Sequence, residues 1–377
     1  MNKTMWVIIV LLVIALGGVF LFMRGGDAPP EAAQTGPIEI GFIGPLTGDA
    51  ASLGVPSKAA VEAAVEEINA EVESTGTGRQ LHVTYEDGQC NAQAATNAAQ
   101  KLINQDKVVA IIGGLCSTET AAFAPMALQA HIPVISYGSS APNLSQLGPL
   151  FSRNYPSDAG QGKFAAEYMY NTLKVKKVAV MYHISDYGTG IKNVFVARFK
   201  ELGGEVVAEE GAEQTATDYR TQLTKIKAAN ADYIYSPLYP AGATAMFKQA
   251  KETGITTKFF GGDSLSDTKL QADVKSLGLS IMFTQIKSDL PDSFNSKIKA
   301  KTGGDQVPVY AATAYDVVAI LANALVTAGS GEELGSAIRA TNYDGVSGHI
   351  QFDQNGDVAG SGYAVYKFEN GSATLVE

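Results

Sequence analysis

Two short segments end in small hydroxyl residues directly after an apolar strand pattern. They are VAIIGGLCSTET, residues 109–120, and IPVISYGSS, residues 132–140. In each, a β-branched apolar run predicts a buried parallel strand. Ser117 or Thr118 then begins an Ala-rich helix, and the second segment closes with two serines. Backbone N–H groups, hydroxyls and a helix N-terminus around one point would bind a carboxylate or another small anion.

Serine and threonine often do no more than cap a helix, so one such loop is weak evidence for a ligand. Two successive loops of this kind favour binding. The sequence contains no G-x-S-x-G, H-E-x-x-H or G-K-[ST] motif, and no G-x-G-x-x-G after a strand. Its four histidines are far apart along the chain. These observations predict a binding protein that uses no cofactor or metal, rather than an enzyme.

Polar and aromatic residues follow other predicted strands later in the chain. The segment SDYGTG presents Tyr187, an aromatic side chain with a hydroxyl donor, and GGDSL presents the lone carboxylate of Asp263. Asp263 would pair with a ligand ammonium or, alternatively, cap the following helix. Tyr239 at a strand end and Tyr310 at a helix start would form aromatic walls of a pocket, or ordinary core.

Strand and helix patterns alternate from Ile38 onward, which predicts parallel sheets covered by helices. Ligands bind beyond the carboxyl ends of the strands in such sheets, where the hydroxyl loops fall. The alternation breaks over residues 143–158 and then restarts, which predicts a second domain of the same architecture. Residues 279–287 are expected to return the chain to the first domain, where the apolar helix 311–328 would pack.

The predicted architecture is α/β, with two Rossmann-like lobes joined by a multi-strand hinge and preceded by an N-terminal transmembrane helix. The predicted boundaries are 1–24 for the membrane segment, 25–36 for a linker, 37–156 plus 285–350 for the first lobe, and 157–284 plus 351–377 for the second. Near the end, residues 348–352 and 363–368 are expected to pair as antiparallel strands around the turn DQNGD, because Asn-Gly is typical of hairpin turns.

The composition fits two exported domains. The chain has 377 residues, 46% of them hydrophobic, and a net charge of −10 without a Lys/Arg run, which argues against nucleic acid as a partner. Met5–Met23 is an apolar run that nearly spans a bilayer core. We expect an uncleaved anchor in the cell membrane with the domains on the extracytoplasmic side. Cleavage within Ala28–Ala33, giving a secreted or periplasmic protein, is the alternative.

The only two cysteines are Cys90 and Cys116. No CxxC pair or neighbouring histidine pattern indicates zinc. In an exported protein two cysteines first suggest one disulfide, with two free thiols as the alternative. A disulfide closing this loop would stabilise the fold by roughly 3 kcal/mol and would fix the strand end that carries Ser117.

These segments together resemble the leucine/isoleucine/valine-binding family of ABC-transporter solute receptors, the type I periplasmic binding proteins. IGFIGPLTG, GGLCST, PVISYGSSAPNL, SDYGTG and GGDSL follow one another in the family's order between Ile38 and the C-terminus. The resemblance implies two lobes that close on an amino acid, of branched-chain type, and deliver it to ABC permease subunits. A ligand-sensing receptor domain, or an amide, urea-like or aromatic acid ligand, is the alternative.

The resemblance also assigns roles to single positions. Ser117, with Thr118 beside it, matches the serine that binds the carboxylate, and Asp263 matches the acidic residue that pairs with the ammonium. The other matches are the loop Gly138, Ser139 and Ser140 for carboxylate and ammonium, Tyr187 closing over the ligand, Leu53, Tyr239 and Tyr310 around its side chain, and the family disulfide Cys90–Cys116. Leu53 stands where the family often has an aromatic residue, and Asp263 where it often has the longer Glu.

Overall fold

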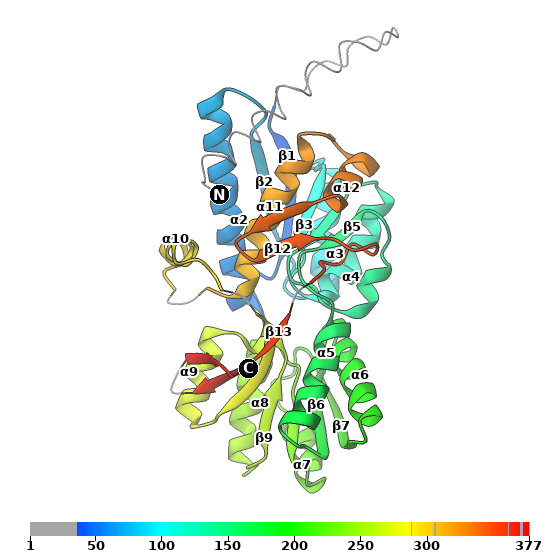
Figure 1. Ribbon diagram of the computed structural model, residues 1–377, viewed down its shortest axis with the longest axis vertical. Coiled ribbons are helices and arrows are strands. Elements are labelled where there is room, and N and C mark those ends of the chain that lie inside the picture. The colour runs from blue at the N-terminus through cyan, green and yellow to red at the C-terminus, as the bar shows by residue number, and fades with distance from the viewer. Residues whose placement is uncertain (1–35, 288, 305–306, 361, 370–371, 377) are drawn as a thin grey trace.

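The computed structural model describes residues 36–287, 289–304, 307–360, 362–369 and 372–376. Two α/β lobes lie end to end along its long axis (Figure 1). The predicted membrane segment 1–24, and the predicted linker apart from Gly36, lie outside the described residues. Within the described ranges, no helix has the length and apolar character needed to cross a membrane.

The first lobe is built on a five-stranded parallel sheet in the order β2-β1-β3-β4-β5. Its strands are β1 Ile38–Gly44, β2 Leu81–Asp87, β3 Ala110–Gly113, β4 Val134–Ser136 and β5 Phe151–Arg153. Its helices are α2 Ala51–Thr75, α3 Ala92–Asn104, α4 Ser117–Gln129, α10 Asp292–Thr302, α11 Val309–Leu325 and α12 Gly331–Arg339. The core of one sheet face is closed by α2 and α11, and that of the other by α3 and α4. The inner strands β1, β3 and β4 are mostly apolar because both faces of the sheet are covered.

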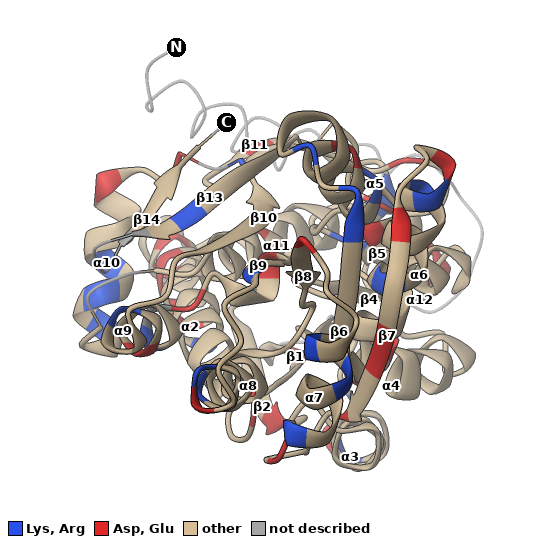
Figure 2. Cartoon of the chain, turned by 90° about the horizontal axis from the view of Figure 1, so that it is seen from below, with Lys and Arg blue, Asp and Glu red and all other residues tan. Residues whose placement is uncertain are grey.

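The second lobe has a seven-stranded sheet in the order β14-β13-β10-β9-β8-β6-β7. Its parallel strands are β6 Lys177–Ile184, β7 Glu205–Glu213, β8 Tyr233–Tyr235, β9 Lys258–Gly261 and β10 Ile281–Ile286, and β13 Tyr363–Glu369 and β14 Ser372–Leu375 are antiparallel at one edge. Its helices are α5 Asp158–Glu167, α6 Asp186–Glu201, α7 Arg220–Ala228, α8 Pro240–Glu252 and α9 Thr268–Leu277. Seen from this end, basic and acidic residues are interspersed rather than gathered on one face (Figure 2).

The chain passes between the lobes after β5, after β10 and before β13 (Figure 1). Two expectations about the later passages are wrong. Most of residues 279–287 is β10, a strand of the second-lobe sheet, and the chain returns to the first lobe only after it. The expected terminal hairpin does not form either. β12 Gly348–Gln351 pairs with β11 Asn342–Gly345, whereas β13 pairs with β10. The turn between them exists, since the Asp353 N–H donates to the Asp357 carbonyl at 2.9 Å.

Candidate functional site

The two hydroxyl loops meet at the carboxyl edge of the first-lobe sheet, because β3 and β4 are adjacent and parallel. Ser117 is the first residue of α4, and its Oγ accepts the N–H groups of Ser140 at 3.2 Å and Ala141 at 3.1 Å. Its own hydroxyl proton is thereby directed away from these two amides. The two hydroxyls of Ser139 and Thr120 lie 2.7 Å apart. Hydrogen bonds between the two loops therefore hold them against each other.

A buried carboxylate and a disulfide hold the start of α4. Glu119 is fully buried and accepts the N–H groups of Cys90 at 2.9 Å and Cys116 at 3.1 Å. Cys90 and Cys116 are joined in a disulfide with a Cα–Cα distance of 5.2 Å. Burial raises the pKa of Glu119 to about 7, against the opposing effect of these backbone hydrogen bonds. Sequence reasoning missed Glu119, although its place at the third position of the helix is typical of a capping box.

The start of α6 positions Tyr187. Ser185 caps this helix, its Oγ accepting the Gly188 N–H at 3.1 Å. Gly188 is required there, since a Cβ would lie 2.2 Å from the His183 carbonyl oxygen. The helix therefore begins close against β6, and its second residue, Tyr187, is buried. The Tyr187 hydroxyl donates to Asp263 Oδ1 at 3.0 Å.

The Asp263 carboxylate connects the two lobes. It follows β9 and is 1% exposed. Its Oδ2 accepts the hydroxyl of Tyr310, on α11 of the first lobe, at 2.9 Å, while Oδ1 accepts Tyr187 of the second. Burial and the nearby Asp263 charge raise the pKa values of Tyr187 and Tyr310 well above the usual range, so both remain protonated donors. Asp263 is not a helix cap but the centre of a closed, buried site.

Aromatic and aliphatic side chains surround this carboxylate. The rings of Tyr187 and Tyr239 have centroids 5.2 Å apart, and Tyr155 stacks on Tyr310 at 4.9 Å. Leu53 on α2 is buried in the same apolar cluster, which extends from the first lobe into the second. Burial raises the pKa of Tyr239 well above its usual range. Asp263 raises it further, and the Ser117 backbone N–H acts in the opposite direction. The Tyr239 backbone N–H donates to His183 Nδ1 at 3.3 Å, so the start of α8 is tied to β6 beside Tyr187.

Gly138 packs closely against Leu115 and the ring of Tyr310. A Cβ there would lie 3.1 Å from Leu115 and 3.2 Å from the Tyr310 ring. The structure thus brings together all the predicted residues except Thr118. The Thr118 hydroxyl donates to Asp186 of the second lobe at 3.0 Å and accepts the Asp186 N–H at 3.2 Å. Thr118 lines an open groove of about 1050 Å³ between the lobes, outside the buried site.

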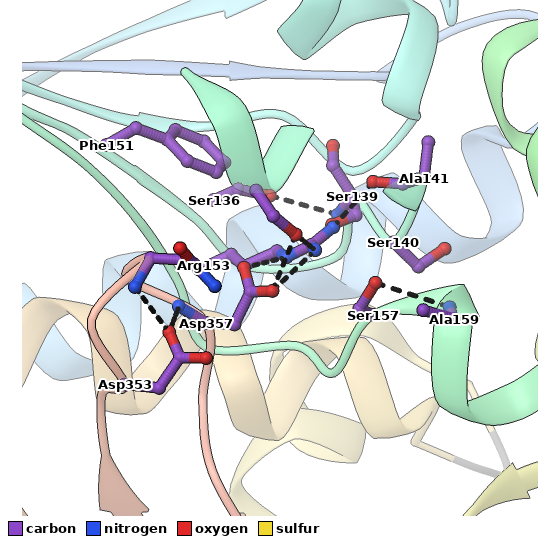
Figure 3. A network of polar contacts seen from close by, with 12 residues as sticks. Ser136, Ser139, Ser140, Ala141, Phe151, Arg153, Ser157, Ala159, Asp353 and Asp357 are labelled. Atoms are coloured by element: carbon purple, nitrogen blue, oxygen red, sulfur yellow. Dashed lines mark hydrogen bonds and ion pairs between the residues drawn. The ribbon is translucent and has the colours of Figure 1, made fainter. Parts of the chain in front are cut away.

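Arg153 holds the second hydroxyl loop by hydrogen bonds to its carbonyl groups. Sequence reasoning did not identify this residue. It is fully buried and pairs with Asp357, with Nε 2.7 Å from Oδ1 and Nη2 3.0 Å from Oδ2. Its Nη1 donates to the carbonyls of Ser139 at 3.2 Å and Ala141 at 2.9 Å (Figure 3). All of these bonds hold the loop rather than a ligand. The pairing joins residues 204 positions apart, so no local pattern predicted it.

Comparison with known proteins identifies the family of the chain. Residues 37–373 match the family described as periplasmic binding protein. The chain belongs to this family. The predicted resemblance is thereby confirmed, and with it the two-lobed α/β fold and the place of the chain among extracytoplasmic solute-binding proteins.

Three similar proteins illustrate the relationship. An amino acid binding protein of Pseudomonas aeruginosa is 29% identical over 343 residues, which are 88% of this periplasmic binding protein and 90% of that one. The crystal structure of a leucine binding protein from Thermotoga maritima has a TM-score of 0.82 and 28% identity, covering 90% of this chain and 98% of that chain. A branched-chain amino acid transporter substrate binding protein from Streptococcus pneumoniae, in complex with isoleucine, has a TM-score of 0.78 and 27% identity, covering 90% and 99%.

Proposed function

We propose that this protein binds an α-amino acid, of branched-chain type, between its two lobes and delivers it to the permease of an ABC transporter. The observation that carries the proposal is the opposite chemistry of the two sides of one buried site. The first lobe offers the Ser117 hydroxyl and the N-terminus of α4, which suit a carboxylate. The second lobe offers the Asp263 carboxylate, which suits an ammonium.

The same geometry argues for an aliphatic side chain on the ligand. Leu53, Tyr239 and Tyr310 are buried in one apolar cluster, and the Tyr310 hydroxyl reaches Asp263 from that cluster. Related proteins whose names include leucine or isoleucine support this assignment. A ligand without an ammonium, such as an aromatic acid, would leave Asp263 unneutralised, so the alternative ligand classes are disfavoured on electrostatic grounds.

The N-terminal segment completes the proposal. Met5–Met23 would anchor the protein in the membrane, and the Pro- and Gly-containing linker would hold the lobes at the extracytoplasmic surface. Anchoring would keep the loaded receptor close to its permease. Mass spectrometry of the protein recovered from membranes tests this, because a retained Met5–Met23 peptide distinguishes an anchor from a cleaved signal.

Thermal unfolding of the full chain in detergent, with a panel of amino acids, amides, aromatic acids and sugars, tests the binding function. A ligand present at 100 times its dissociation constant should add about 2.7 kcal/mol to the free energy of unfolding and raise Tm by a few degrees. We expect this shift with leucine, isoleucine or valine. A shift confined to ligands without an α-ammonium would refute the amino-acid assignment while leaving a solute receptor.

A further inference from the structure

We propose that Gln214 of the second lobe and the Cys90 carbonyl of the first form a latch that slows ligand release, and that the Cys90–Cys116 disulfide strengthens this latch by fixing the carbonyl. The inference rests on the proposed function and adds a means of retaining the ligand. Gln214 directly follows β7, and its Nε2 donates to the Cys90 carbonyl at 3.1 Å. A bond between the lobes is lost when they separate, so it favours the closed state.

The latch lies in the open groove between the lobes, outside the buried site. Cys90 and Gln214 both line this groove of about 1050 Å³, as do Thr118 and Asp186, which also bond across the lobes. Neither Cys90 nor Gln214 is among the residues proposed to contact the ligand. Gln214 is half-buried, so its bond to the carbonyl is partly shielded from water. Its contribution is therefore to closure rather than to recognition of the ligand.

The loop that presents the Cys90 carbonyl has a rare backbone conformation. Gln89 and Cys90 have φ angles of +57° and +51°, in the left-handed region that residues other than glycine seldom adopt. Such a conformation persists only where neighbouring contacts enforce it. The Gln89 N–H donates to Asp87 Oδ1 at 3.0 Å, and the Asn91 N–H donates to the Gly88 carbonyl at 2.8 Å. The loop is thus held on both sides of Cys90.

Cys90 is also tied to the start of α4 in two ways. Its side chain forms the disulfide with Cys116, and its N–H donates to Glu119 Oε1 at 2.9 Å. Both links lie inside the first lobe, whereas the carbonyl accepts its hydrogen bond from the second. Without the disulfide, Cys90 could relax to a negative φ, which would turn the carbonyl away from Gln214. The covalent bond within one lobe therefore supports a hydrogen bond between the two.

The first test measures leucine dissociation by stopped flow, with the full chain in detergent. Gln214→Met keeps the approximate shape of the side chain and removes the donor, whereas Gln214→Glu places a carboxylate against the Cys90 carbonyl oxygen. We expect dissociation to be about fivefold faster in Gln214→Met, as for the loss of one net hydrogen bond, and faster still in Gln214→Glu. The association rate should change little. Wild-type dissociation rates in both variants would overturn the proposal.

Gln222→Met is the matched control. The Gln222 Nε2 also donates to a backbone carbonyl, that of Gly211 at 3.3 Å, but both residues belong to the second lobe. The same substitution there removes a hydrogen bond that does not depend on closure, so leucine should dissociate at the wild-type rate. If Gln222→Met accelerates release as much as Gln214→Met does, the effect is general loosening of the second lobe and the latch is rejected.

A double-mutant cycle tests the role of the disulfide. Loss of the disulfide also alters the loop that carries Ser117, so the informative quantity is the effect of Gln214→Met with and without the disulfide. In Cys90→Ser/Cys116→Ser, adding Gln214→Met should accelerate dissociation by less than about twofold, because the carbonyl is no longer fixed. An undiminished effect would show that the disulfide does not support the latch. If the cysteine variant does not fold, Asp87→Ala, which frees the Gln89 N–H, replaces it in the cycle.

Failure of the proposed function gives a different result. If the wild-type chain binds no α-amino acid, the function is refuted. The latch is then tested with the amide, aromatic acid or sugar that raises Tm, because the Gln214 bond does not depend on the chemistry of the ligand. If the wild type binds leucine and both Gln214 variants release it at the wild-type rate, the receptor function stands and only the latch is rejected.

Discussion

The two lobes build their halves of the site in different ways. The first lobe holds the Ser117 hydroxyl, whose Oγ accepts the Ser140 and Ala141 N–H groups, with hydrogen bonds and a disulfide that lie inside that lobe. The second lobe supplies the acceptor Asp263, and one of the two hydroxyls that satisfy it, that of Tyr310, comes from the first lobe. The hydrogen bonds around Ser117 thus lie within one lobe, whereas the two hydroxyls bonded to Asp263 come from both lobes.

Each lobe also contains a buried titratable group whose pKa is shifted by burial. The first lobe buries Glu119, an acid with a pKa raised to about 7, and the second buries His183, a base with a pKa lowered to about 4. His183 Nδ1 accepts the Tyr239 N–H at 3.3 Å, which places its proton on Nε2, toward the Tyr219 hydroxyl at 3.0 Å. Burial causes both shifts, and in each case it favours the neutral form of the group.

Removing the disulfide should have the largest effect, and it should lower the stability of the first lobe alone. In Cys90→Ser/Cys116→Ser the loop around Ser117 loses its covalent restraint, and stability should fall by about 3 kcal/mol. Hydrogen exchange monitored by mass spectrometry should show faster exchange in α3 and α4, with the second lobe unchanged. Equal loss of protection in both lobes would mean that the lobes unfold as one unit.

The two buried groups predict opposite responses of the lobes to acid. Between pH 4.5 and about 7 the native state keeps a proton on Glu119 that the unfolded chain loses, so the first lobe loses stability as pH rises. Between about 4 and 6.5 the unfolded chain protonates His183 but the native state does not, so the second lobe loses stability as pH falls. Each shift corresponds to on the order of 3 kcal/mol at most.

Glu119→Gln and His183→Asn separate these two responses. Urea unfolding is measured from pH 4.5 to 7.5. The stability of Glu119→Gln should no longer fall toward neutral pH, because the amide does not titrate. His183→Asn should lose the decline toward acid pH. If each variant keeps the pH profile of the wild type, the pKa values of Glu119 and His183 do not differ between the native and unfolded states.

Asp263→Ala should have the next largest effect, on affinity rather than stability. It removes the proposed partner of the ligand ammonium and leaves the hydroxyls of Tyr187 and Tyr310 without their acceptor. Leucine binding should weaken by more than about tenfold, or about 1.4 kcal/mol, in calorimetric titration. Asp273→Asn, a partly exposed second-lobe carboxylate bonded to Thr244, is the control and should bind normally. Unchanged affinity in Asp263→Ala would refute its assigned role.

Local patterns predicted the elements and the loops of the site well. The predicted alternation of strands and helices from Ile38 onward is confirmed, because elements such as β1, α3 and β9 combine a clear hydrophobic pattern with a turn or cap at their ends. Pairing was not predictable in the same way. β12 pairs with β11 rather than with β13, and the apolar alternation that marks a strand says nothing about its neighbour. β5, with three residues inside an irregular segment, was too short to show a period.

In the candidate site, too, the residues at strand ends were predictable from local sequence, whereas their partners were not. The hydroxyls, Tyr187 and Asp263 follow strands directly, so strand ends located them. The partners of those residues lie far along the chain. Tyr310 reaches Asp263 across the lobes, and Arg153 reaches Asp357 over 204 positions. Buried polar groups such as Glu119 and Asp158 also escaped sequence reasoning, because only the tertiary fold defines their burial.

The smallest predicted effect concerns Thr118, the one predicted ligand residue that the structure places at the rim. Its two hydrogen bonds with Asp186 join the lobes, so Thr118→Val should make closure less favourable by about 1 kcal/mol. We expect leucine affinity to fall by roughly fivefold through faster dissociation, measured by stopped flow. Thr75→Val, at the exposed end of α2, controls for loss of a threonine hydroxyl. If leucine affinity falls as much as in Asp263→Ala, Thr118 contacts the ligand carboxylate instead. The Thr118–Asp186 hydrogen bonds would then not be what stabilises the closed lobes.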